Sequence, residues 1–184
     1  MGSPQAPDRV MIRQMFGDFN NFLDLGCGTC PELTGLKEMY RKEINYTGLD
    51  ITEKIVNFNI AKGINCVKSS LNNLPFEENS FDIVHCRHVV EHMKGVETPL
   101  NEMIRVSRNK IFLCFFIDPL ENADINKPEH KILLENEGLK GEIHHNQYNK
   151  ILIDNLLKSN KKVKNFQWFK TPPSHSKSFL FIQV

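Results

Sequence analysis

The 184-residue sequence has no long uninterrupted apolar run. A helix needs roughly 20 apolar residues to span a bilayer, so we expect no membrane-spanning segment and no membrane partner. The first residues (1–6) also lack the apolar core of a signal peptide, and we expect a cytoplasmic protein. Charge is nearly balanced, with 23 Lys and Arg against 22 Asp and Glu. The protein therefore has no strong electrostatic field that would attract nucleic acid, and we expect no nucleic-acid partner.

Cysteine is scarce as well. The five cysteines are an odd number and stand mostly inside or beside apolar runs, which is typical of a reducing compartment rather than a disulfide framework. No internal repeat or low-complexity segment is visible. The length and the 40% apolar share indicate one globular domain over residues 1–184, with residues 1–18 as an N-terminal helix segment.

The most informative stretch is Phe22–Pro31, with the sequence FLDLGCGTCP. An apolar segment ends near an acid, two glycines two positions apart follow, and Pro31 stands where it fits the first position of a helix. This order predicts a strand, a tight turn and a helix start, which together form the first half of a βαβ nucleotide site. Gly26 and Gly28 would let a ligand lie against the main chain.

The turn does not complete the dinucleotide pattern G-x-G-x-x-G, because Cys30 and Pro31 occupy the two plausible places of the third glycine. Asp24 also precedes the turn by two residues, and its carboxylate suits a cationic ligand better than a pyrophosphate. A second predicted strand, 45–51, contains Asp50 about 20 residues beyond the turn, where an acid can accept both hydroxyls of a ribose.

Further along, residues 71–76 (LNNLPF) lead into residues 79–92 (NSFDIVHCRHVVEH). With the glycine turn and the acid after the second strand, these blocks resemble the class I S-adenosylmethionine-dependent methyltransferases, type 11. The resemblance is strong from about Phe19 to Phe116. It implies an enzyme of class EC 2.1.1.- with S-adenosylmethionine as its cofactor and without a metal.

The resemblance also implies a set of cofactor contacts. The methionine part would lie near Asp24, and the ribose would bind Asp50 with Ile51 on the adenine face. Ser70 and Leu71 match positions at the adenine edge, although many relatives have an acid where Ser70 stands. The full set of implied cofactor residues is Asp24, Gly26, Cys27, Gly28, Asp50, Ile51, Ser70, Leu71, Cys86 and Arg87.

Strand and helix patterns alternate along the chain, which indicates an α/β fold with a Rossmann-like doubly wound sheet of about seven mostly parallel strands. We expect strands at 64–68, 82–86 and 110–117, a helix capped by Thr52, and a closing pair at 163–169 and 178–184. The family resemblance implies the strand order 3-2-1-4-5-7-6 with an antiparallel last strand.

Two other motifs invite different interpretations. Cys27 and Cys30 form a C-x-x-C pair, a redox or zinc spacing, but no second cysteine pair follows and both lie in the predicted cofactor turn. Residues 88–92 (HVVEH) fit the H-x-x-E-H zinc-peptidase pattern, yet the methyltransferase family has nearly the same letters after its fourth strand. We interpret Glu91 and His92 as residues that hold neighbouring loops together.

The acceptor is the open question. Residues 118–146 follow the fifth strand, at the edge where ligands bind in open α/β sheets, and we expect a substrate-side insertion there. If the acceptor is a hydroxyl, a base is needed, and the candidates are His88, His144 and His145.

No Asn/Asp-Pro-Pro-aromatic block follows the fourth strand, which favours a small-molecule or saccharide acceptor over a nucleobase. A cofactor-binding module or inactive partner subunit, and a nicotinamide oxidoreductase, are the alternatives. The oligomeric state is not predicted.

Overall fold

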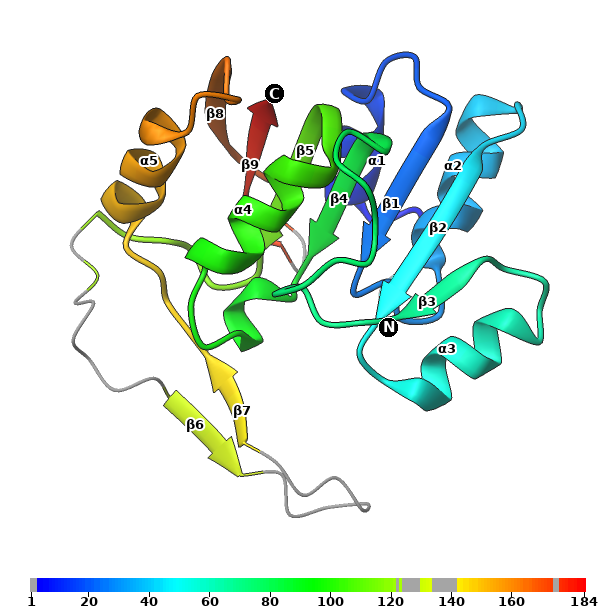
Figure 1. The fold of residues 1–184 in the computed structure, drawn as a ribbon, viewed down its shortest axis with the longest axis horizontal. Coiled ribbons are helices and arrows are strands. Elements are labelled where there is room, and N and C mark those ends of the chain that lie inside the picture. The colour runs from blue at the N-terminus through cyan, green and yellow to red at the C-terminus, as the bar shows by residue number, and fades with distance from the viewer. Residues whose placement is uncertain (1–2, 122, 124–129, 134–141, 174–175) are drawn as a thin grey trace.

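The computed structural model describes residues 3–121, 123, 130–133, 142–173 and 176–184. A sheet of seven strands in the order β3-β2-β1-β4-β5-β9-β8 forms its centre (Figure 1). The strands are β1 (Asn21–Leu25), β2 (Asn45–Asp50), β3 (Cys66–Lys68), β4 (Phe81–Arg87), β5 (Ser107–Phe115), β8 (Asn165–Lys170) and β9 (Ser178–Gln183). Strands β1 to β5 pair in parallel, and β9 is antiparallel to both neighbours. The predicted fold class and strand order are confirmed.

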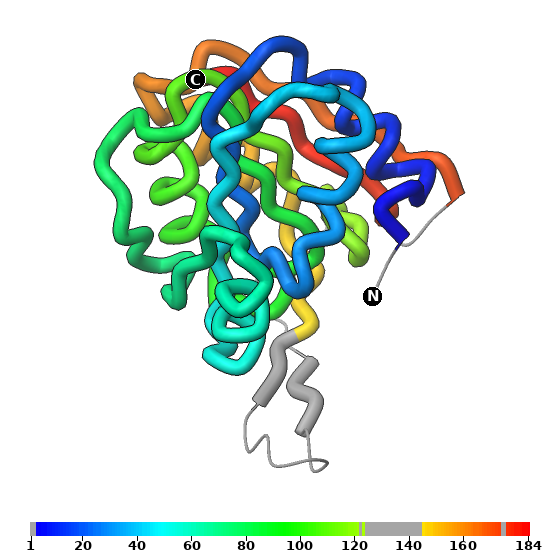
Figure 2. The backbone as a smooth tube through the Cα atoms, turned by 90° about the vertical axis from the view of Figure 1, so that its right-hand side faces the viewer, coloured from blue at the N-terminus to red at the C-terminus, as the bar shows by residue number. Residues whose placement is uncertain are grey.

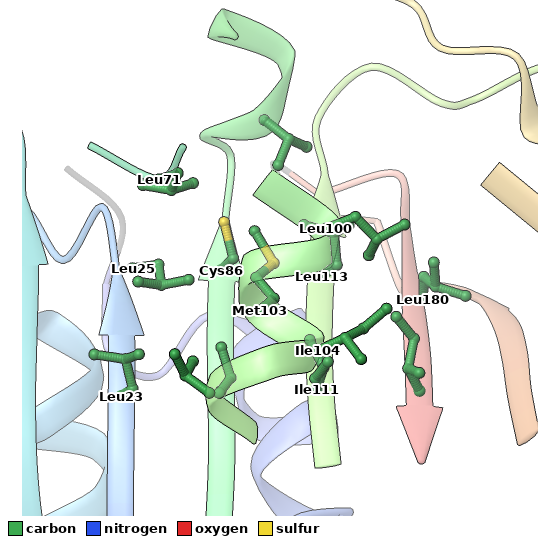
Figure 3. Close-up of a cluster of buried hydrophobic side chains, with 14 of the residues drawn as sticks. Leu23, Leu25, Leu71, Cys86, Leu100, Met103, Ile104, Ile111, Leu113 and Leu180 are labelled. Atoms are coloured by element: carbon green, nitrogen blue, oxygen red, sulfur yellow. The ribbon is translucent and has the colours of Figure 1, made fainter. Parts of the chain in front are cut away.

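Helices cover both faces of this sheet (Figures 1 and 2). They are α1 (Pro7–Gln14), α2 (Pro31–Tyr40), α3 (Glu53–Ile60), the single 3-10 turn η1 (Val90–His92), α4 (Glu97–Val106) and α5 (Lys150–Ser159). Apolar residues of α1, α2 and α3 pack into one buried cluster, whereas those of α4 and α5 pack into another. The second cluster, part of which is drawn in Figure 3, contains Leu23 and Leu25 of β1 together with Met103 and Ile104 of α4.

Several predicted boundaries need correction. The third strand starts at Cys66 rather than at position 64, and the fifth starts at Ser107 rather than at 110. Thr52 stands at the N-cap of α3, but its side chain makes no capping hydrogen bond. The physical reason is that the Ile55 N–H, from which the Thr52 hydroxyl could accept, donates to the Thr52 main-chain carbonyl at 3.0 Å. The Asp50 carboxylate accepts from the Thr52 N–H at 2.9 Å. The acid at the end of β2 thus organises the start of the next helix.

Within 118–146 the structure adds an element that the sequence patterns did not predict, a hairpin of β6 (His130–Leu133) and β7 (Glu142–His145). The hairpin extends beyond the carboxyl edge of the sheet (Figure 1). Residues 122, 124–129 and 134–141 of the expected insertion lie outside the described residues. Among the residues that are described, no helix has the length and apolar character needed to cross a bilayer.

Helix α1 packs on α2 through buried charge as well as apolar contacts. The Glu32 carboxylate of α2 bonds to Arg9 at 2.5 Å and to Arg13 at 3.2 Å, and all three side chains are at most 8% exposed. The Arg13 guanidinium lies directly over Gly35, where an added Cβ would overlap it. The absence of a side chain at Gly35 therefore leaves room for the Arg13 guanidinium.

We expect Gly35→Ala to destabilise the fold by about 1–3 kcal/mol, because overpacking forces Arg13 away from Glu32. Urea unfolding of both proteins at neutral pH measures the loss. The matched control is Gly95→Ala, since a Cβ at Gly95 meets nothing within 4 Å and should change stability by less than about 0.5 kcal/mol. Equal stabilities for the two variants would contradict the packing argument.

Candidate functional site

The glycine turn connects β1 to α2 at the carboxyl edge of the sheet. Gly26 and Gly28 have φ values of 66° and 53°, a conformation that favours glycine. The two glycines serve different needs: a Cβ on Gly26 would overlap Val89, whereas a Cβ on Gly28 would meet nothing within 4 Å. Gly26 therefore allows close packing, and Gly28 leaves the main chain open on the side where a ligand can approach.

Asp50 lies beside this open turn. Its Oδ2 accepts from the Gly28 N–H at 3.2 Å, and its Oδ1 accepts from the Thr52 N–H at 2.9 Å. Each carboxylate oxygen has a second lone pair, so the group can still accept two further hydrogen bonds. Ile51 next to it is 68% exposed, which leaves its side chain available as an apolar surface. These positions agree with a nucleoside lying across the end of β2.

Asp24 is only 4% exposed and lies in a buried polar triad. Its Oδ2 accepts from the Tyr46 hydroxyl at 2.7 Å, and its Oδ1 bonds to Nδ1 of His85 at 2.9 Å. Burial alone would lower the pKa of His85, but the hydrogen bonds to Asp24 and to the Cys114 thiol raise it to about 10. The histidine is therefore a cation at neutral pH, and it neutralises the acid that precedes the glycine turn.

The remaining implied cofactor residues fall into two groups. Ser70 is partly exposed, and its hydroxyl accepts from the Asn72 N–H at 3.2 Å within its own loop. Leu71 and Cys86 are buried in the apolar cluster beneath the turn (Figure 3). Their side chains are core groups, so only their main-chain atoms can serve a ligand.

Arg87 ends β4 and joins a network of segments that are distant in sequence. Its guanidinium bonds to Asp8 of α1 at 2.7 Å, and the Ser176 hydroxyl donates to the same carboxylate oxygen at 2.5 Å. Burial opposes ionisation of Asp8, yet the bonds from Ser176 and Arg87 hold its pKa at about 2. The network fixes the start of α1 and the segment before β9 against the end of β4.

His88 is the next residue, and its φ of 61° turns the chain sharply at the end of β4. Its Nδ1 lies 3.3 Å from Nη1 of Arg87, and its Nε2 lies 2.8 Å from the Ser176 hydroxyl. A guanidinium can only donate, so Nδ1 is the acceptor and Nε2 carries the proton. As a base, His88 would have to use the lone pair that now faces Arg87.

Rings gather next to this network, at the ends of β4 and β5. Phe116 has its ring centroid 5.4 Å from those of His88 and His92 and 5.6 Å from that of His145. The structure thus brings two of the three candidate bases, His88 and His145, onto one phenyl ring. The third, His144, pairs with Lys131 in the hairpin backbone, and its side chain lies outside the described residues.

Glu91 holds the loops around these rings, as the sequence analysis expected. Its Oε1 accepts from the Phe116 N–H at 2.7 Å, and its carbonyl accepts from the Asn146 N–H at 2.8 Å. Burial raises the pKa of Glu91 to about 7. The zinc-peptidase pattern needs its histidines on one helix, but η1 covers only Val90–His92 and His88 precedes it in a left-handed conformation. The described residues contain no group of three or more His, Cys, Asp or Glu side chains placed to hold a metal ion.

The sequence analysis missed the partners of these residues. Asp8 and Ser176 are separated from each other by 168 positions, and no local pattern connects them. A signal did exist for His85, because it is a polar residue inside the apolar strand β4 and stands in register with Asp24. Two neighbouring parallel strands, each with a polar residue near its carboxyl end, indicate a pair.

A cavity of about 530 Å³ lies at the opposite, amino edge of β1 and β2. Its lining includes Asn20 and Asn45, which stand at the start of these strands, together with Lys37 and Lys62. None of the implied cofactor residues lines it. The glycine turn and the ring cluster therefore remain the candidate site, because both lie at the carboxyl edge, where ligands bind in open α/β sheets.

Comparison with known proteins decides the family. The model of a family described as a methyltransferase domain matches residues 23–115, about half of the chain. The chain belongs to the methyltransferase-domain family. The matched residues include the glycine turn, Asp50 and the end of β4, so the resemblance seen in the sequence is confirmed. S-adenosylmethionine is the cofactor of this family.

Individual relatives agree with this assignment. The chain is 31% identical over 103 residues to an uncharacterized protein of Methanocaldococcus jannaschii, covering 54% of this chain and 42% of that protein. It is 33% identical over 89 residues to a demethylmenaquinone methyltransferase of Staphylococcus epidermidis, covering 46% and 37%. A solved S-adenosylmethionine-dependent methyltransferase of Methanosarcina mazei shares the fold, with 19% identity, a TM-score of 0.62 and coverage of 94% and 96%. The chain spans less than half the length of these two curated relatives.

The triad of this methyltransferase domain predicts a pH dependence of stability. The pKa of His85 is about 10 in the folded state against 6.5 as its ordinary value, so the folded state binds the proton more tightly. The contribution of the charged His85 to the free energy of unfolding is complete below about pH 6.5 and is lost as the pH rises through about 10. His85→Asn, which keeps a donor toward Asp24 but no charge, should be less stable than the native protein at pH 6.5.

The difference in the free energy of unfolding between the native protein and His85→Asn should shrink steadily up to pH 10. Urea unfolding with reductant present, at closely spaced pH values, measures it. Other groups titrate in this range in both proteins, so only the difference between the two is informative. A difference that stays constant from pH 6.5 to 10 would show that His85 is not the charged partner of Asp24.

Proposed function

We propose that this domain binds S-adenosylmethionine at the glycine turn and transfers its methyl group to a small-molecule or saccharide acceptor, an activity of class EC 2.1.1.-. The observation that carries the proposal is the pair formed by the open main chain at Gly28 and the Asp50 carboxylate beside it. The first provides close approach for a ligand, and the second provides an acceptor pair for ribose hydroxyls.

The buried charges favour this cofactor over a dinucleotide. Asp24 lies under the turn, and each of its oxygens keeps a second lone pair for an ammonium group or a bridging water. A pyrophosphate would meet the Asp50 carboxylate as a like charge, and the third glycine of a dinucleotide turn is replaced by Cys30. The nicotinamide oxidoreductase alternative is therefore disfavoured.

Methyl transfer requires mainly that the acceptor atom be aligned with the methyl group. When bound, the cofactor supplies a sulfonium that is already a strong electrophile, so this chain has to orient the acceptor and exclude water. The ring cluster of His88, His92, Phe116 and His145 stands at the ends of β4 and β5, and we assign it to the acceptor side. For a hydroxyl acceptor, His88, His144 and His145 stay the candidate bases.

Two observations support the acceptor class. The chain has no Asn/Asp-Pro-Pro-aromatic block after Arg87, which disfavours a nucleobase acceptor. The staphylococcal relative is named for a small molecule, demethylmenaquinone. Incubation with labelled S-adenosylmethionine and fractionated small-molecule and saccharide pools, followed by detection of the demethylated cofactor and of labelled product, tests the proposal. Binding without turnover on any fraction would favour the alternative of a cofactor-binding module or inactive partner subunit.

The domain boundaries and the compartment are further parts of the proposal. We assign residues 1–184 to one methyltransferase domain, because α1 and the segment before β9 both contact the end of β4 through the network around Asp8. Five free, buried cysteines favour a reducing compartment such as the cytoplasm.

The first test of the cofactor site is Asp50→Asn. The variant keeps the shape of Asp50 but loses the charge, so the bonds to the two ribose hydroxyls weaken. Bonds to charged groups contribute about 1.5–3 kcal/mol each, and we expect affinity for S-adenosylmethionine to fall by at least about tenfold. Isothermal titration calorimetry measures it for the cofactor and its demethylated product.

The matched control is Glu97→Gln, an exposed acid in the first turn of α4, which should bind like the native protein. Thermal unfolding of both variants separates a binding defect from loss of structure. Unchanged affinity in a folded Asp50→Asn protein would overturn the ribose assignment, and tighter binding of NAD than of S-adenosylmethionine would support the oxidoreductase.

A second test addresses the metal. Methyl transfer to an aligned acceptor needs no Lewis acid, so we expect the affinity for S-adenosylmethionine to be the same before and after dialysis against a chelator. Elemental analysis of the purified protein should find zinc well below one equivalent. Stoichiometric zinc that disappears in a His88→Asn variant would revive the zinc-peptidase interpretation.

A further inference from the structure

Three thiols lie together beneath the glycine turn. The Sγ atoms of Cys27 and Cys66 are 3.7 Å apart, and both are contacted by the side-chain amide of Asn59. Cys30 hydrogen-bonds to Cys27 from the other side, and the Cys30 N–H donates to the Cys27 carbonyl at 2.9 Å. Cys27 is therefore flanked by two other cysteines.

The backbone provides the space for this cluster. A Cβ on Gly48 would come within 2.8 Å of the Cys27 sulfur and 3.4 Å of the Cys66 sulfur. Strand β2 thus lacks a side chain at the point where the two sulfurs meet above it. Cys30 caps α2 in the left-handed conformation, with φ of 58°, and this turn holds its thiol next to Cys27. The cluster therefore depends on the absence of a side chain at Gly48 and on the left-handed backbone of Cys30.

We propose that Cys27, Cys30 and Cys66 form an oxidation site in which a hydroperoxide converts Cys27 to a disulfide and thereby closes the cofactor turn. The Cys30 sulfur attacks the peroxide oxygen, giving a sulfenic acid and an alcohol. The Cys27 sulfur then attacks the Cys30 sulfur, forming the S–S bond and releasing water. Two thiols and one hydroperoxide give one disulfide, one alcohol and one water. Cys66 can then displace Cys30 from Cys27 by thiol–disulfide exchange.

The electrostatics agree with this order of attack. Hydrogen bonds from the Cys27 thiol and from the Tyr46 hydroxyl lower the pKa of Cys30. The neighbouring Cys30 and burial raise the pKa of Cys27. Because the thiolate is the reactive form, Cys30 is the first of the two to react. Cys27 is the thiol that resolves the sulfenic acid.

The consequence for the site follows from where Cys27 stands. It lies between Gly26 and Gly28, and its N–H donates to the Leu49 carbonyl at 3.0 Å. A disulfide to Cys30 or Cys66 moves the Cys27 sulfur. The turn moves with it, away from the position that leaves Gly28 open beside Asp50. Oxidation should therefore weaken cofactor binding, and bound cofactor should protect the thiols. This inference rests on the proposed cofactor site.

The experiment treats the full chain with hydrogen peroxide, with and without S-adenosylmethionine. Peptide mapping should then find Cys27 linked to Cys30 or Cys66. Calorimetry should show affinity for the cofactor reduced by about tenfold or more and restored by dithiothreitol. Cofactor present during treatment should slow the loss. Circular dichroism before and after treatment checks that the fold persists.

Two variants make the test specific. Cys30→Ala/Cys66→Ala keeps Cys27 but removes both partners, and its affinity should not respond reversibly to peroxide. Cys114→Ser, which removes a buried thiol of β5 but keeps a hydrogen-bonding group toward Nε2 of His85, should respond like the native chain. Reduced Cys27 after treatment, or a Cys27 disulfide with unchanged affinity, overturns the inference. Peptide mapping detects the disulfide whether or not the cofactor binds. If the reduced chain does not bind S-adenosylmethionine, the proposed cofactor site is wrong, and mapping still shows separately whether the disulfide forms.

Discussion

The structure depends on neutralising three buried acids on one face of the sheet. Asp8, Asp24 and Glu32 are at most 4% exposed, and an unpaired charge so far from water would cost several kcal/mol. Each has a cationic partner: Arg87 for Asp8, His85 for Asp24, and two arginines of α1 for Glu32. These pairs fix where α1 lies, because that helix supplies one acid and two cations.

The same pairs prepare the ligand edge. His85 neutralises the acid below the glycine turn, and Arg87 is neutralised by Asp8, so neither charge is left to distort the ends of β1 and β4. A hydrogen-bonded network of this kind stabilises one arrangement of side chains against others, because a partial set would leave charges unpaired. The turn and the ring cluster thus lie on a buried layer whose charges are already paired.

Much of this could be predicted from the sequence, for reasons that are local. The alternation of apolar strands and helices, the glycine turn and Asp50 lie in short segments whose spacing reflects backbone geometry, and their places in the structure agree. The network around Asp8 could not be predicted, since its members come from both ends of the chain and meet only when β9 pairs with β5. The predicted capping role of the Thr52 side chain was wrong because the Ile55 N–H donates to the Thr52 main-chain carbonyl instead.

Cys30 shows how a departure from a family pattern can keep the underlying geometry. The resemblance implies a third glycine at its position, and its φ of 58° is the conformation that glycine adopts without strain. For a residue with a Cβ, such a conformation costs of order 1–3 kcal/mol unless the surroundings hold it. Here Pro31 begins α2 directly after it, and the thiol bonds to Cys27 and Tyr46. The turn therefore keeps the left-handed shape that a glycine would give it, and the side chain that replaces the glycine adds a thiol to it.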